Sequence, residues 1–149
     1  MDERTIAELA AWLTLAVNAL AGGFAGWRWW QVLPSEAAWP MLRAGQAIAV
    51  LQAGVAGVLF AAGHHPHDGL YWLYALLPVA IGLIAEQLRL VSAEQVLENR
   101  GLPDAKAMGA LPESEQRSVV LSIVRRELGI MALAAIVVAV LALRAALIA

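Results

Sequence analysis

The 149-residue sequence contains no cysteine, which excludes disulfide bonds, thiolate metal sites and cysteine nucleophiles. Aspartate occurs only at positions 2, 68 and 104, so an Asp-rich diphosphate site is excluded as well. The zinc-protease, serine-hydrolase and phosphate-loop motifs are missing. Basic residues are interleaved with acidic ones, and this gives no nucleic-acid patch. The sequence therefore assigns no catalytic residue and requires no cofactor, and it favours a protein without enzymatic activity.

Histidine is scarce, and all three histidines lie in one short loop. A haem held within a helical bundle takes its axial ligands from different helices, so a bis-histidine haem site is not expected. Imidazole and carboxylate together suit a divalent transition metal such as Zn²⁺, Cu²⁺ or Ni²⁺. The candidate metal ligands are His64, His65, His67 and Asp68. A tight Pro-Asp-Gly turn explains the same loop without any metal.

Apolar residues are abundant: they make up 61% of the chain, charged residues only 15%, and the mean hydropathy is +0.69. A transmembrane helix needs roughly 20 apolar residues to cross a hydrocarbon core of about 30 Å. Four windows qualify, at about 6–26, 44–62, 70–90 and 128–148. The leader before the first window is acidic, which argues against a cleavable signal peptide. We expect a single membrane domain over 1–149, an all-α polytopic integral membrane protein built as an antiparallel four-helix transmembrane bundle.

The basic residues indicate an orientation. Arginine outnumbers lysine nine to one and Ala and Leu dominate, which is typical of a GC-rich bacterial gene and favours a bacterial plasma membrane. Lys and Arg accumulate in cytoplasmic loops. Eight of the ten basic residues lie between the first and second spans or between the third and fourth: Arg28, Arg43, Arg89, Arg100, Lys106, Arg117, Arg125 and Arg126. The N- and C-termini and the histidine loop are therefore expected to be extracytoplasmic.

The second span carries a small residue at every fourth position, which predicts a packing stripe. Residues four apart lie near one helical face, and small side chains let membrane helices approach closely. The stripe consists of Gly45, Ala49, Ala53, Gly57 and Ala61. Two interpretations remain open: packing within the bundle, or docking of another membrane subunit or a second copy of this chain.

The segment 91–127 predicts a cytoplasmic helical hairpin that extends the third and fourth spans. Gly101 suits a helix C-terminus, Asp104 suits the cap of a short turn ended by Gly109, and Pro112 suits the first turn of a new helix. That helix would run for roughly 36 residues, or about 54 Å, which exceeds the bilayer core. Its apolar stripe is Val119, Val120, Ile123 and Val124. The stripe either packs on Val96 and Leu97 or docks a partner.

Polar residues inside the spans are functional candidates because burying them in lipid is costly. Glu86 lies about one turn inside the inner interface, at a depth similar to that of polar residues on the other helices. The resulting intramembrane polar belt consists of Arg43, Gln46, Glu86, Arg89 and Glu127. Asn18 and Gln52 fall near mid-membrane, where an interhelical hydrogen bond explains them. The belt is either structural or a proton or substrate site.

Three functions fit these features. The first is a non-enzymatic accessory or scaffold subunit that packs with other membrane helices and docks a partner through its hairpin. The second is a small proton- or ion-coupled transporter or channel using Glu86, and the third is an extracytoplasmic metal-binding protein using the loop from His64 to Asp68. The expected partners are the lipid bilayer and other membrane subunits or a second copy of the chain, with no nucleic acid.

Overall fold

The structure, a computed structural model, describes residues 2–149 as four long α-helices and one short 3-10 helix. The helices are α1 (Glu3–Trp30), α2 (Ala38–Ala61), α3 (Tyr71–Asn99), η1 (Ala105–Ala110) and α4 (Glu113–Ile148). All four α-helices are long and apolar enough to cross a membrane. The expected all-α architecture with four helices of membrane-spanning length and composition is confirmed.

Local sequence signals account for most of the helix ends. After α3, Gly101 has φ +70°, and the Leu102 N–H donates to the Leu97 carbonyl at 2.9 Å, which closes the helix as a glycine C-cap does. The Asp104 carboxylate accepts a hydrogen bond from the Ala107 N–H at 2.9 Å and caps η1. Pro112 immediately precedes α4 rather than lying in its first turn. The predicted helix length of roughly 36 residues is the observed one, 36.

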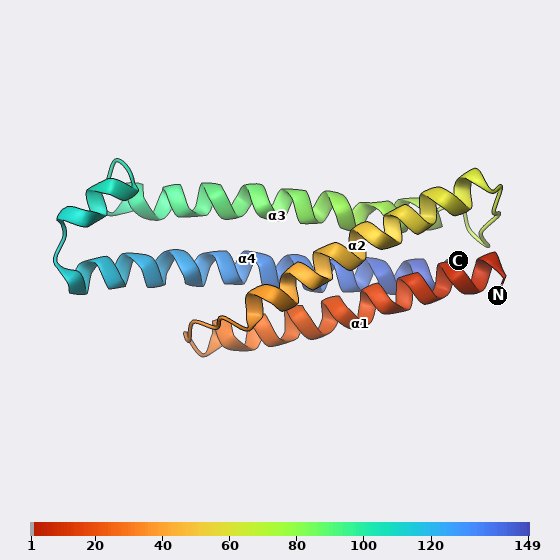
Figure 1. Cartoon of the computed structure of the whole chain (residues 1–149), viewed down its shortest axis with the longest axis horizontal. Coiled ribbons are helices and arrows are strands. Elements are labelled where there is room, and N and C mark those ends of the chain that lie inside the picture. The colour runs from red at the N-terminus through yellow and green to blue at the C-terminus, as the bar shows by residue number, and fades with distance from the viewer. Residues whose placement is uncertain (1) are drawn as a thin grey trace.

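The helices lie lengthwise beside one another, and both chain termini are at the same end of the molecule (Figure 1). Beyond the other end of α1 and α2, α3 and α4 continue as a pair and are joined by η1 (Figure 1). One apolar cluster near the termini includes Ala11, Leu59 and Tyr71, and α4 completes it. A second cluster, further along α1, gathers residues of all four α-helices around Leu42 and Met131.

The interior is built from small residues, and the large apolar side chains point outward. Alanine supplies most of the buried positions of α1 and α4 and recurs among those of α2 and α3. Leu20, Val58 and Phe60 are 68%, 70% and 69% exposed. In water this arrangement would leave an extensive apolar surface uncovered. In lipid it is favourable, because the acyl chains are as apolar as leucine and helices associate by close backbone approach.

The packing stripe of α2 is only partly buried. Gly45 and Ala49 are buried and Ala53 is half-buried, whereas Gly57 and Ala61 are exposed. Positions four apart turn by about 40° per step around an α-helix, so a long row of them leaves the contact face. The buried positions of α2 instead alternate in steps of four and three: Ala38, Leu42, Gly45, Ala49, Gln52, Ala56 and Leu59. The outer half of the stripe therefore takes no part in packing this bundle.

Candidate functional site

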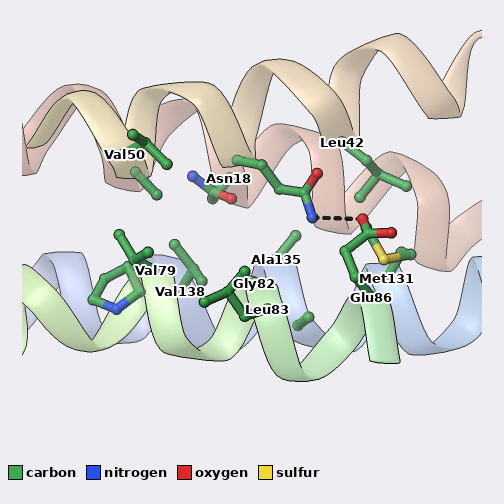
Figure 2. Close-up of a pocket in the computed structure, with 14 residues that line it drawn as sticks. Asn18, Leu42, Val50, Val79, Gly82, Leu83, Glu86, Met131, Ala135 and Val138 are labelled. Atoms are coloured by element: carbon green, nitrogen blue, oxygen red, sulfur yellow. Dashed lines mark hydrogen bonds between the residues drawn. The ribbon is translucent and has the colours of Figure 1, made fainter. Parts of the chain in front are cut away.

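A cavity of about 190 Å³ lies between α2 and α3, among the apolar parts of the helices. Its walls are almost entirely apolar, and α4 contributes residues such as Met131 and Val138 (Figure 2). Only Asn18, Gln46 and Glu86 bring polar side chains to the lining. Figure 2 shows Glu86 at one end of the cavity, with Val50 and Val79 toward the other. The cavity is thus an apolar space closed at one end by a carboxylate.

Four residues of the predicted belt form one hydrogen-bonded network at that end. Arg43 and Gln46 lie one turn apart on α2, and Glu86 and Arg89 lie one turn apart on α3. Arg43 forms an ion pair with Glu86, and its Nη1 also donates to Gln46 Oε1 at 2.7 Å. Gln46 Nε2 donates to Glu86 Oε1 at 2.9 Å, and Arg89 Nη2 lies 3.1 Å from Glu86 Oε2. Both carboxylate oxygens are therefore bound by positively charged or amide donors.

Glu127, the fifth belt residue, stands apart from this network. It is half-buried on α4, and within residues 2–149 it makes no ion pair and no side-chain hydrogen bond. Arg89, by contrast, has a second contact, because its guanidinium lies 5.6 Å from the ring centroid of Trp39. A cation over an aromatic face gains electrostatic attraction from the ring. The sequence does not indicate this contact, because no spacing rule pairs residues on different helices.

The arrangement favours a fixed ion pair over a mobile proton site. A proton or cation carried by Glu86 would have to compete with two guanidinium groups and an amide already bound to the carboxylate. Charged groups that neutralise each other in this way can remain at membrane depth at reduced cost. Chemically, the network joins α2 to α3 next to the cavity.

Asn18 and Gly45, which the sequence placed in separate groups, make one contact in the structure. Asn18 is buried, and its Nδ2 donates to the carbonyls of Thr14 at 3.0 Å and Gly45 at 3.1 Å. A Cβ on Gly45 would lie 2.6 Å from Asn18 Oδ1, so only glycine leaves room for the amide. The contact joins α1 to α2. Gln52 is equally buried, but neither of its amide atoms has a hydrogen-bond partner within residues 2–149.

The histidine loop does not gather its four candidate ligands. His64 Nδ1 lies 3.3 Å from a carboxylate oxygen of Glu3, and its ring packs edgewise near Tyr71. Asp68 Oδ1 accepts the Leu70 N–H at 2.9 Å, as expected for a turn residue. His65 and His67 are exposed. Across residues 2–149 no group of three or more metal-ligating side chains comes together, and the metal site stays a prediction from sequence.

Comparison with known proteins gives no assignment: no protein-family model, no curated protein and no solved structure matches the chain.

Proposed function

We propose that this chain is a non-enzymatic integral membrane protein, an accessory or scaffold subunit that packs with other membrane helices and docks a partner protein. In this proposal the helices form an antiparallel bundle in a bacterial plasma membrane. The termini and the histidine loop lie outside, and the α3–α4 extension, residues 91–127, lies in the cytoplasm. The distribution of basic residues supports this orientation.

The observation that carries the proposal is the length of the α3–α4 pair. The helix α4 has 36 residues, whereas about 20 suffice to cross the hydrocarbon core. The part before residue 128 covers roughly 22 Å at about 1.5 Å per residue. It continues together with α3 past the ends of α1 and α2 (Figure 1). A helix pair of this length serves a purpose other than crossing the bilayer.

The extension is also held in one shape, as a preformed binding surface requires. Val96 of α3 and Val119 of α4 are both buried. Arg100 Nη2 donates to Ser118 Oγ at 3.2 Å and connects the end of α3 to α4. Val120 and Leu121 remain 44% and 45% exposed on the same extension. These two apolar side chains are the contacts that we assign to the partner.

The cavity is the one feature that favours the alternative, a proton- or ion-coupled transporter or channel using Glu86. Against it stands the bonding of that carboxylate, which both Arg43 and Arg89 approach. We therefore rank the accessory role first. The two functions differ in one measurable property: a transporter loses flux when Glu86 becomes glutamine, and a scaffold subunit does not.

The proposal is tested by photocrosslinking in the native membrane. A photoreactive amino acid replaces Val120 on the extension or, as a matched control, Leu133, which is 64% exposed on the apolar part of the same helix. We expect a discrete protein adduct from position 120 and lipid adducts from position 133.

Absence of a protein adduct at position 120 would contradict the docking role. A protein adduct at position 133 but not at position 120 would contradict it as well, because it would indicate association through the membrane helices alone. Gentle detergent extraction followed by mass spectrometry then identifies the crosslinked protein.

A further inference from the structure

One face of α4 changes character where α1 ends. In the membrane part, α4 packs against α1 through buried alanines such as Ala132 and Ala135. Past the C-terminal end of α1 at Trp30, this side of α4 loses its helical neighbour (Figure 1). There the hollows along α4 are lined by serine and arginine together with apolar side chains such as Val96 and Leu121. The vacated space is therefore positively charged.

A hollow of about 490 Å³ occupies this space, and we call it the arginine hollow. It is lined by Trp29 of α1, by Val96, Asn99 and Arg100 of α3, and by Ser122, Arg125 and Arg126 of α4. Three guanidinium groups and one side-chain amide face a space that no acidic side chain lines. A hollow of this size falls in the usual range of ligand sites, roughly 300–1,000 Å³.

The three arginines lack acidic partners. Among residues 2–149, no carboxylate lies within ion-pairing distance of Arg100, Arg125 or Arg126. Arg125 is placed by an aromatic contact, with its guanidinium 5.5 Å from the Trp29 ring centroid. Arg100 is placed by its hydrogen bond to Ser118. Most N–H donors of these three arginines therefore have no acceptor among the described residues, and neutral neighbours hold the Arg100 and Arg125 side chains in place.

The depth of Arg125 and Arg126 indicates the kind of anion. With the hydrocarbon core beginning near Leu128, Arg126 and Arg125 lie roughly 3–5 Å beyond it, at about 1.5 Å per residue. The headgroup layer occupies about 5–8 Å on each side of the core, so both guanidinium groups lie at the level of lipid phosphates. The Trp29 ring beside them is typical of the same interface.

We propose that the arginine hollow binds the phosphate of an anionic membrane lipid. Arginine suits this ligand because its planar guanidinium can give two parallel hydrogen bonds to phosphate oxygens. The acyl chains of the lipid would lie against the exposed apolar surface of the helices. The inference depends on the membrane placement proposed above, but not on the docking of a protein partner.

The test measures binding of phosphatidylglycerol and phosphatidylcholine to the purified full chain in neutral detergent by native mass spectrometry. We expect phosphatidylglycerol to bind at least tenfold more tightly than phosphatidylcholine. R126Q should reduce that affinity by roughly 10- to 100-fold, the effect of losing one hydrogen bond to a charged group. K106Q is the matched control, since Lys106 carries the same charge on η1 but does not line the hollow. The affinity of K106Q for phosphatidylglycerol should stay within twofold of the wild-type value.

A conservative variant keeps the test interpretable. R126K preserves the charge and should retain more affinity than R126Q, and circular dichroism checks that all variants keep their helix content. Equal binding of the two lipids, or equal losses in R126Q and K106Q, would overturn the inference. Displacement of the lipid by millimolar inorganic phosphate would make this a site for a soluble anion and would also overturn it. Crosslinking at position 120 is unaffected by any of these results, so the two proposals fail separately.

Discussion

Close approach of α1 to α4 at Gly22 gives a quantitative test of the helix packing. A Cβ added to Gly22 would lie 2.9 Å from Ile136 Cγ1, 3.0 Å from Ile136 N and 3.1 Å from Ala132 O. Two of these three atoms belong to the backbone of α4, so a change of rotamer cannot remove the clash. Replacing Gly22 by alanine therefore forces the two helices apart.

The neighbouring residue provides the control. A Cβ on Gly23 would meet nothing within 4 Å. Both substitutions gain helix propensity, about 1 kcal/mol for Gly to Ala, but only Gly22→Ala also incurs the cost of overpacking, about 1–3 kcal/mol. The propensity gains cancel in the comparison. The free energy of unfolding of Gly22→Ala should therefore be about 1–3 kcal/mol lower than that of Gly23→Ala.

Thermal unfolding in detergent, followed by tryptophan fluorescence, measures the difference. For a chain of this size about 1 kcal/mol corresponds to roughly 2–4 °C in Tm, so the two variants should differ by roughly 2–12 °C. Gly23→Ala should unfold at or slightly above the wild-type temperature. If Gly22→Ala proves as stable as Gly23→Ala, the close contact between α1 and α4 is not present in the protein.

Three further predictions concern stability. Asn18→Ala removes the hydrogen bond to the Gly45 carbonyl and should lower the free energy of unfolding by about 0.6–2 kcal/mol in the same assay. An unchanged Tm would mean that this hydrogen bond does not form. Glu86→Gln leaves two guanidinium groups without their carboxylate, so the free energy of unfolding should fall by about 1–3 kcal/mol, between the values for exposed and buried pairs. Ion flux in proteoliposomes should not change; lost flux at unchanged stability would favour transport. Gly101→Ala places a Cβ at φ +70° and should lower the free energy of unfolding by about 1–2 kcal/mol. For Gly109→Ala, where a Cβ meets open space, the change should stay within about 0.5 kcal/mol. Equal effects of the two substitutions would argue against the glycine-capped end of α3.

The features that could be predicted from the sequence are those that depend on neighbours in the chain. The four apolar spans, the glycine after α3 and the length of α4 follow from local composition and helix-end chemistry. Glu86 and Arg43, two members of the predicted polar belt, form an ion pair because they lie at a similar depth, which residue counting estimates well.

Features that depend on the relative rotation of two helices could not be predicted. The spacing of four residues predicts Gly57 on the same packed face as Gly45, but Gly57 is exposed in the structure. The contact between Asn18 and Gly45 depends on the axial position of α1 relative to α2, and no residue pattern within either helix encodes that position. The same holds for the arginine hollow, whose residues come from three helices.

The two sides of the bundle differ in how firmly they are closed. At Gly22 the backbones of α1 and α4 nearly touch, whereas α2 and α3 face each other across the cavity. The Glu86 network joins these two helices at one end of the cavity, and apolar contacts such as Phe60 with Trp72 join them nearer the termini. Mechanical compliance should therefore be greatest between α2 and α3, while the α1–α4 pair stays rigid. In a bilayer, lateral pressure would then strain the Arg43–Glu86 link, which joins α2 to α3 beside the cavity.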